Sequence, residues 1–236
     1  MKAMIFAAGL GTRLKPITDS MPKALVPVAG KPMLQYVIEK LKASGFNEII
    51  INIHHFGEQI INFVRLNNSF GIRIEFSDER DKLLDTGGGI KKACRFFDDG
   101  KPFLIHNSDI LSNIDLNELY NYHLNYESKA TLVCSKRDTS RYLLFDKKNH
   151  LKGWINEKTK EIKTPIPNFN PDKYQQLAFS GIHIINPSVF KLMNDFPDKF
   201  SIIDFYLSIC GKYNINYFSR GDLEIIDVGK PESLKS

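Results

Sequence analysis

The beginning of the chain constrains its fold and chemistry more than any other stretch. Lys2–Ala7 is a short apolar run of the length expected for a strand that is buried on both faces. It leads into Ala8-Gly9-Leu10-Gly11-Thr12, where small residues leave a bare backbone that a phosphate or a nucleobase can approach closely. Arg13 and Lys23 then supply cations, and the two prolines between them keep that segment out of regular helix. The pattern predicts a strand followed by a loop that receives a triphosphate.

Two other phosphate-binding motifs do not fit this loop. The dinucleotide fingerprint G-x-G-x-x-G needs a third small residue where this chain has Leu14, and an acidic residue after the second strand. The second apolar run, Glu48–Ile53, is instead followed by His54 and His55, which we expect to be structural because successive strand residues point to opposite faces. The P-loop pattern G-x-x-x-x-G-K-[ST] is absent from the sequence. An NAD-binding oxidoreductase is therefore disfavoured.

Composition narrows the class of protein further. The chain has 236 residues, of which 42% are hydrophobic and 25% charged, as is typical of globular proteins. Its net charge of +5 is scattered, without a basic run of the kind that binds nucleic acid. Three cysteines that lie far apart predict neither a disulfide framework nor a zinc site, and favour a cytoplasmic location. No apolar stretch has membrane-spanning length, so we expect no membrane partner, and the sequence does not indicate an oligomeric state.

Strand and helix patterns alternate in the first half of the chain. Strands are expected at 2–7, 48–53, 72–76 and 102–106. Between them we expect a helix that Lys31-Pro32 opens and Gly45 ends, and helices at 57–66 and 90–97. This β-α-β-α-β-α-β order predicts an α/β fold, a Rossmann-like three-layer α/β/α sandwich with a mixed, mostly parallel sheet. If the strand order is 3-2-1-4, the loops after the first and fourth strands line one crevice.

The second half is less regular. We expect helices at 116–126, 187–193 and 202–210, strands at 130–135, 178–185, 215–218 and 223–227, and a hairpin of 142–145 with 151–155. Residues 156–176 contain prolines and few apolar residues, which predicts a loop or flap. We expect a single domain over 1–236, with halves 1–110 and 111–236.

The loop after the first strand resembles the signature of the sugar-1-phosphate nucleotidyltransferases. The matching residues are Gly9-Leu10-Gly11-Thr12-Arg13-Leu14, Pro16, Thr18 and Pro22-Lys23. The resemblance covers nearly the whole chain and implies the nucleotidyltransferase, or GT-A-like, form of the α/β fold, with 1–110 binding the nucleotide and 111–236 the sugar. It implies that a sugar 1-phosphate attacks the α-phosphorus of a nucleoside triphosphate (NTP) and that pyrophosphate leaves; both substrates are the expected partners.

The charged loop residues are the candidate catalytic groups. We assign Arg13 to the leaving β- and γ-phosphates, and Lys23 to the α-phosphate and the incoming sugar phosphate. Ala8, Gly9, Leu10, Gly11 and Thr12 are the expected nucleotide-binding residues. A phosphate monoester is already charged at pH 7, so no general base is needed and catalysis rests on alignment and charge neutralisation.

Two aspartates are candidate Mg²⁺ ligands. Asp109 follows the fourth strand, and a carboxylate that faces a polyphosphate there needs a cation between them. Asp227 lies in Asp-Val-Gly-Lys-Pro-Glu, which resembles the family's Asp-Val-Gly-Thr-Pro-Glu motif and thereby implies the second ligand. Alternatively, Asp109 caps the next helix, although Asp115 is better placed to do so, and Asp227 merely shapes a turn. Ser108 replaces the family's more usual glycine before the first metal aspartate.

The resemblance also implies residues for the nucleobase and the sugar. Gly87 and Gly88 are expected to contact the base, with a glycine-rich helix start as the alternative. The sugar phosphate is assigned to Asn107, Gly153, Glu157, Lys158 and Gly181.

Three segments, Asp85–Ile90, Ala178–Ile182 and Ser201–Leu207, look most like the N-acetylmuramate-1-phosphate uridylyltransferases of cell-wall recycling. UTP and N-acetylmuramate 1-phosphate are then the expected substrates, with mannose- or heptose-1-phosphate guanylyltransferases as the alternative. A degenerate nucleotide- or sugar-sensing module is the alternative outside the enzymes. No hexapeptide repeat follows Asp227, so we expect no C-terminal β-helix.

Overall fold

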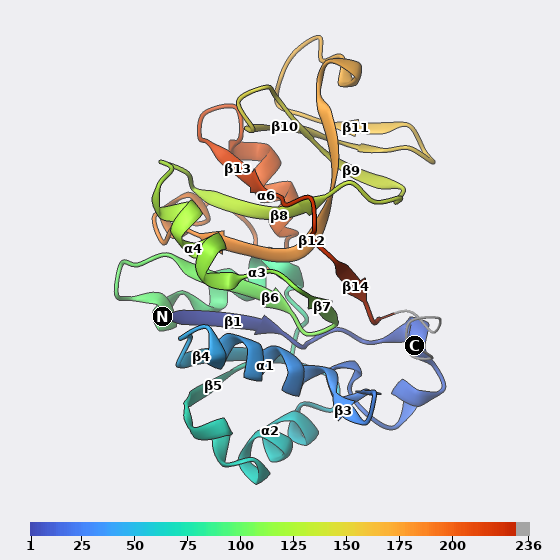
Figure 1. Ribbon diagram of the computed structural model, residues 1–236, viewed down its shortest axis with the longest axis vertical. Coiled ribbons are helices and arrows are strands. Elements are labelled where there is room, and N and C mark those ends of the chain that lie inside the picture. The colour runs from blue at the N-terminus through green and yellow to red at the C-terminus, as the bar shows by residue number, and fades with distance from the viewer. Residues whose placement is uncertain (230–236) are drawn as a thin grey trace.

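The computed structural model describes residues 1–229 (Figure 1). Its first half is a parallel sheet in which β1 pairs with β4 on one side and β6 on the other, and β4 pairs with β5. The bounds are β1 (Lys2–Phe6), β4 (Glu48–Ile53), β5 (Arg73–Asp78) and β6 (Phe103–Asn107). The spatial order β5-β4-β1-β6 confirms the predicted order 3-2-1-4.

The long strand β12 (Gln175–Ile185), orange in Figure 1, connects the two halves of the sheet. Its C-terminal part pairs antiparallel with β6 and β8, and its N-terminal part pairs with β9. The other strands here are β8 (Ala130–Ser135), β9 (Arg141–Phe145), β10 (Leu151–Asn156), β11 (Glu161–Lys163) and β13 (Ile215–Phe218). The sheet is therefore mixed, with most of its parallel pairings in the first half.

Helices cover both faces of this sheet. The helices are α1 (Met33–Ala43), α2 (Gly57–Leu66), α3 (Asp85–Lys92), α4 (Leu116–Leu124), α5 (Val189–Leu192) and α6 (Ile202–Ile209). Alternate residues of β1 point to opposite sides: Ala3 and Ile5 join the core under α1, α2 and α4, whereas Met4 joins the core under α3, α5 and α6. These layers are the predicted three-layer sandwich.

One predicted loop contains a strand. Within 156–176, β11 pairs antiparallel with β10, and a short 3₁₀ turn follows at Pro171–Lys173. The turn into β11 is closed by the Lys160 amide, which donates to the carbonyl of Asn156 at 2.7 Å, with Lys160 at φ +58°. The three residues of β11 are all exposed, so no apolar alternation marked this strand in the sequence.

Small ribbons complete the fold. β7 (Ile110–Ser112) pairs antiparallel with β14 (Ile225–Asp227), and β2 (Pro27–Val28) pairs with β3 (Lys31–Pro32). Further 3₁₀ turns lie at Thr12–Leu14, Ile17–Asp19, Lys23–Leu25, Asn68–Gly71 and Ala93–Phe97. Asp115 caps α4, as predicted, by accepting from the amides of Asn117 and Glu118.

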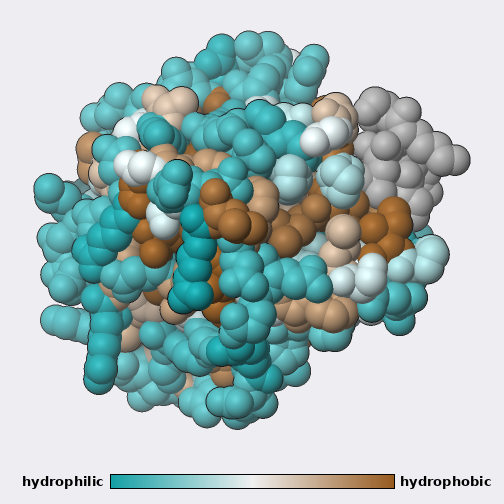
Figure 2. All heavy atoms as spheres, turned by 90° about the horizontal axis from the view of Figure 1, so that it is seen from below, coloured by the Kyte–Doolittle hydropathy of each residue, from teal (hydrophilic) through white to brown (hydrophobic). Residues whose placement is uncertain are grey.

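The surface on the α2 side is largely hydrophilic, with apolar side chains gathered in a band across its middle (Figure 2). The three cysteines are free thiols. Over residues 1–229, none of the helices combines the length and the apolar character needed to cross a membrane.

Candidate active site

The loop after β1 is folded back on itself and held by Gly11. Gly11 has φ +66°, and its carbonyl accepts from the hydroxyl of Thr18 and the amide of Leu14, both at 2.8 Å. A Cβ at Gly11 would lie 2.8 Å from Cγ2 of Thr18, so only glycine fits this fold of the loop. Gly9 has open space around it. The backbone at Gly9 is therefore open to a ligand, whereas the backbone at Gly11 is held in place by hydrogen bonds within the loop.

The predicted cations and carboxylates converge beside this loop. The ammonium of Lys23 contacts Oδ2 of Asp109, and Nη1 of Arg13 lies 3.8 Å from Oδ2 of Asp227. A Cβ at Gly229 would collide with Nζ of Lys23 and lie 2.8 Å from the Asp109 carboxylate. The lysine and both aspartates are largely buried, whereas the Arg13 side chain is 57% exposed.

The two carboxylates are brought together by the β7–β14 ribbon. Asp227 is paired with Ile110, which follows Asp109 directly, and the Val228 amide donates to the carbonyl of Asp109 at 2.9 Å. Asp109 also lies at the carboxyl end of β6, beside the end of β1. Topology therefore places a carboxylate pair at the point where phosphate-binding loops meet in α/β sheets.

A cavity of about 360 Å³ opens beside the loop, next to Lys23 and Asp109; Arg13 and Asp227 are not among the residues that line it. Ala8, Gly9, Lys23, Asn107 and Asp109, all predicted as site residues, line it. Of the other predicted loop residues, Leu10 is half-exposed and Thr12 begins a 3₁₀ turn.

Asn52 and Glu79 line the same cavity and were not singled out from the sequence. Asn52 Oδ1 accepts from the amides of Ala7 at 2.7 Å and Ala8 at 3.2 Å, and its Nδ2 donates to Glu79 at 2.9 Å. Glu79, which is 1% exposed, also accepts from the Leu84 amide at 3.1 Å. A polar residue within the apolar run of β4 was the available signal for Asn52. Nearby, His54 Nδ1 contacts the carbonyl of Glu79 at 2.7 Å, as expected of a structural histidine.

The structure does not place Gly87 and Gly88 on the cavity wall. Both amides donate to the carbonyl of Phe200, at 2.9 and 3.3 Å, so they are not free for a base. A Cβ at Gly87 would collide with the Phe200 ring, and one at Gly88 with the carbonyl of Asp198. Gly87 and Gly88 therefore allow residues 198–200 to pack closely against the start of α3.

Three neighbours of these glycines reach the cavity instead. Asp85 and Thr86 line it, and Asp85 has φ +62°, an uncommon conformation for a residue other than glycine. Lys199, between the two residues that contact the glycines, also lines the cavity and adds a cation that sequence patterns did not reveal.

The predicted sugar-side residues fall into two groups. Gly181 has φ +76° and abuts Asn107, so that a Cβ would lie 2.8 Å from Cγ of Asn107. Gly153 packs instead against Phe169, where a Cβ would lie 2.9 Å from the ring. Glu157 and Lys158 lie in the β10–β11 turn, where Glu157 pairs with Lys160 at 2.5 Å and Lys158 is exposed. Only Asn107 and Gly181 therefore lie beside the cavity.

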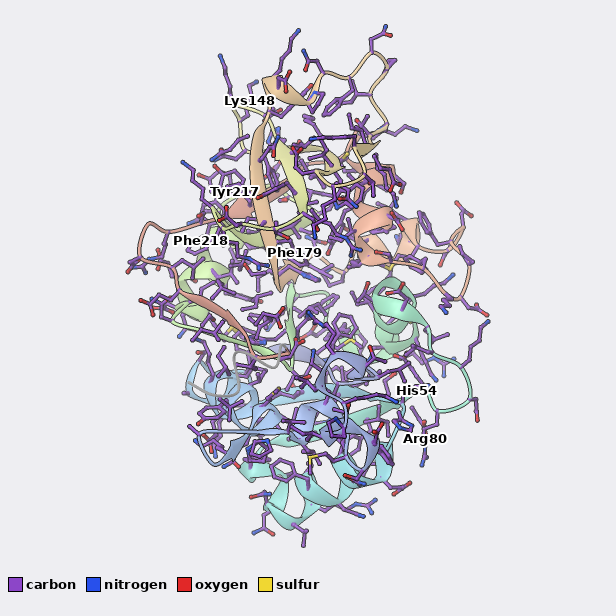
Figure 3. The ribbon with its side chains drawn as sticks, turned by 90° about the vertical axis from the view of Figure 1, so that its right-hand side faces the viewer. His54, Arg80, Lys148, Phe179, Tyr217 and Phe218 are labelled. Carbon is purple, nitrogen blue, oxygen red and sulfur yellow. The ribbon has the colours of Figure 1, made fainter. Side chains whose placement is uncertain are left out.

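A second cavity of about 510 Å³ lies against β9, β10 and β11. Phe179, labelled in Figure 3 near the junction of the two halves, is part of its wall. Arg137, Arg141 and Trp154 also line it.

Known proteins support an assignment to one family. The profile of the nucleotidyl transferase family matches residues 2–236. The N-acetylmuramate alpha-1-phosphate uridylyltransferase of Neisseria meningitidis is 44% identical over 115 residues, 49% of each chain. A mannose-1-phosphate guanyltransferase of Aspergillus fumigatus is 30% identical over 240 residues, 99% of this chain and 62% of that one. The chain spans between 37% and 63% of the length of the curated relatives it matches.

Solved structures agree on the fold. HddC from Yersinia pseudotuberculosis, complexed with GMP-PN, superposes with a TM-score of 0.76 at 25% identity, covering 99% of this chain and 96% of that one. A UDP-glucose pyrophosphorylase from Acinetobacter baumanii has a TM-score of 0.78 at 16% identity over 99% of this chain and 90% of that one, a likeness of fold. The predicted family is confirmed: this chain belongs to the nucleotidyl transferase family.

Proposed function

We propose that this protein is a sugar-1-phosphate nucleotidyltransferase, which converts an NTP and a sugar 1-phosphate to an NDP-sugar and pyrophosphate. The observation that carries the proposal is that Lys23 and Asp109 meet at the wall of the cavity beside Gly9. The β7–β14 ribbon brings the Arg13–Asp227 pair next to Asp109. A sensing module has no need of this complete set of cations and carboxylates, so the geometry favours catalysis.

The charges suit an in-line displacement at phosphorus. An oxygen of the sugar phosphate forms a bond to the α-phosphorus while the bond to the β-phosphate oxygen breaks, and pyrophosphate carries away the electron pair. Lys23, largely buried at the cavity wall, is placed to neutralise the α-phosphate and the attacking phosphate. The Arg13 side chain is 57% exposed and lies beside Asp227, which suits contact with the leaving phosphates. The nucleophile is already ionised, so no proton transfer is required.

The donor set fits Mg²⁺. Asp109 and Asp227 supply carboxylate oxygens. The described part of the chain contains no cluster of three or more His, Cys, Asp or Glu side chains that could hold a metal ion, so these two aspartates are the protein ligands that we propose. Mg²⁺ commonly binds one or two carboxylates and completes its shell with phosphate oxygens and water. When bound there, the ion neutralises phosphate charge. Lys23 and Arg13 contact these carboxylates, and on this proposal they turn to phosphate when substrate enters.

UTP and N-acetylmuramate 1-phosphate are the proposed substrates, supported by the 44% identity to the Neisseria uridylyltransferase. The product then feeds cell-wall synthesis. A guanylyltransferase acting on mannose 1-phosphate or a heptose 1-phosphate is the alternative, supported by the longer match to the Aspergillus enzyme and by the HddC structure with GMP-PN.

Pyrophosphate release tests this function. The full chain is incubated with Mg²⁺, each of the common NTPs and a panel of sugar 1-phosphates. We expect release with one nucleotide and a narrow set of sugars, and a Lys23→Ala variant as the inactive control. Absence of pyrophosphate with every pair would refute the proposal.

A further inference from the structure

The second cavity is built on one face of the β9–β10–β11 sheet. In the ladder, Leu143 is opposite Trp154, which is opposite Lys163. Likewise Arg141 is opposite Asn156, which is opposite Glu161. Because alternate residues of a strand point to the same side, these six side chains form one wall. The start of α6, with Ser201, Ile203 and Asp204, forms the facing wall.

This cavity adjoins the first one on the sugar side. Phe179 lines the second cavity and is two residues from Gly181, which abuts Asn107 of the first cavity. On the other side, Ser201 of the second cavity precedes Ile202, whose amide donates to Thr86 of the first at 2.9 Å. The second cavity therefore lies on the Asn107 side of the first, where a sugar attached to a phosphate at Lys23 and Asp109 could reach it.

Arg137 and Arg141 are the cations of the second cavity that form no ion pair within the described residues. Lys163 is paired with Asp204 at 3.0 Å and lies 5.3 Å from the centre of the Trp154 ring. Arg137 donates through Nη2 to the carbonyl of Phe179 at 3.0 Å, and its Nε is buried without a hydrogen-bond partner among residues 1–229.

Arg141 completes the pair of guanidinium groups. It forms no salt bridge within the described residues. The remaining acid of the wall, Glu161, is separated from Arg141 by Asn156 in the ladder. Both arginines thus keep N–H donors for a ligand.

Resting on the proposed function, we propose that this cavity holds the sugar and that Arg137 and Arg141 bind a carboxylate substituent on it. A guanidinium fork matches a carboxylate in geometry and charge. The Trp154 ring offers a flat apolar surface beside the two cations. The substrate class is therefore acidic sugar 1-phosphates rather than neutral hexose 1-phosphates.

Paired substrates test the inference. N-acetylmuramate 1-phosphate is compared with N-acetylglucosamine 1-phosphate, which lacks the carboxylate. We expect the wild-type kcat/KM to be about 10–100-fold higher for the acidic sugar, as for a charge-assisted contact, and Arg141→Gln to lower that ratio to near one, mainly through KM. Arg141→Lys restores part of the ratio. Lys148→Gln, at the β9–β10 turn away from the cavity (Figure 3), keeps the wild-type ratio.

Direct binding separates this inference from the proposed reaction. Calorimetry with the same two sugar phosphates measures affinity whether or not any nucleotide supports turnover. Weaker binding of the acidic sugar to Arg141→Gln by tenfold or more, with a smaller change for the neutral sugar, supports the inference. Equal use or equal binding of the two sugars by the wild type overturns it, and so does an unchanged preference in Arg141→Gln.

Discussion

Asp109 and Asp227 are held as neighbours by main-chain hydrogen bonds rather than by contacts of their own carboxylates. The amide of Val228 donates to the carbonyl of Asp109, and Asp227 is fixed in the ladder opposite Ile110. None of these bonds involves the side-chain oxygens. Oδ1 of Asp227 does accept from the amide of Gly229 at 3.0 Å, as in the turn-shaping role considered above, but an asparagine Oδ1 can accept the same bond, so the charge can be removed while the strands remain.

Neutralising one carboxylate should therefore affect turnover without unfolding the protein. For Asp227→Asn we expect pyrophosphate release to fall by about 10²-fold or more, because one electrostatic contact to the transition state is lost. The Mg²⁺ concentration for half-maximal rate should rise, and EDTA should abolish the wild-type reaction. Circular dichroism serves as the control for folding. A variant with the wild-type Mg²⁺ dependence would contradict the metal assignment.

Removing the Lys23 cation is the second test. Lys23→Ala should lower turnover by about 10²-fold or more while the far-ultraviolet circular dichroism stays that of the wild type. Pyrophosphate release measured at saturating substrate separates this effect from weaker binding. Release near the wild-type rate would remove Lys23 from the catalytic groups.

Lys199 is predicted to bind substrate because it lines the first cavity. Lys199→Ala should reduce kcat/KM by about 10–100-fold, as expected for the loss of one charge-assisted hydrogen bond. Lys101→Ala is the matched control, since Lys101 is exposed just before β6, at the strand end opposite the cavity. Equal kinetics for the two variants would argue against a role for Lys199.

Gly88 should matter for stability. An added Cβ would collide with the backbone carbonyl of Asp198, in a segment that is tied to α3 by the hydrogen bonds of the Gly87 and Gly88 amides to the carbonyl of Phe200. We expect Gly88→Ala to lower the free energy of unfolding by about 1–3 kcal/mol, as overpacking does. Gly221→Ala, with open space around it, should unfold at the wild-type urea concentration. Similar urea midpoints for Gly88→Ala and Gly221→Ala would show that residues 198–200 do not pack tightly against Gly88.

Buried histidines predict acid sensitivity. Burial lowers the pKa of His183 to about 3 and the pKa values of His106 and His123 to about 4. Between these values and the unfolded pKa of roughly 6.5, the unfolded chain binds more protons, so stability falls as pH drops through this window. The slope should reach about 1.4 kcal/mol per pH unit for each histidine.

Urea unfolding at pH 7.5, 6 and 5 measures that slope. His183 is 1% exposed and its ring nitrogens have no partner among residues 1–229, so His183→Leu should reduce the pH dependence by about one third. An unfolding free energy that is flat between pH 7 and 5 would contradict the assignment of neutral buried rings.

Strong apolar runs explain why the first half of the fold was predictable. Glu48–Ile53 and Gly57–Leu66 match β4 and α2, because long periodic segments carry their own signal. The sequence did not predict β11 and β7, because three residues are too few to show an alternating pattern. Each is a strand only because it pairs with another one, β11 with the adjoining β10 and β7 with the distant β14.

The candidate site shows the same division. Strand order and the motifs predicted that Lys23 and Asp109 would meet, because both follow carboxyl ends of neighbouring strands. The contacts of Gly87 and Gly88 with Phe200 join segments far apart in sequence, which no local pattern reports. The same contacts position Lys199 at the cavity, so its place in the site could not be predicted from the sequence either.

The β7–β14 ribbon also has a consequence during synthesis on the ribosome. β14 is made long after β7, on the order of ten seconds later at ordinary elongation rates. Throughout that interval a nascent chain possesses Asp109 but has not yet produced Asp227. Lys23 is made before Asp109, so the cation that contacts this carboxylate in the finished fold is already in the growing chain when Asp109 is added.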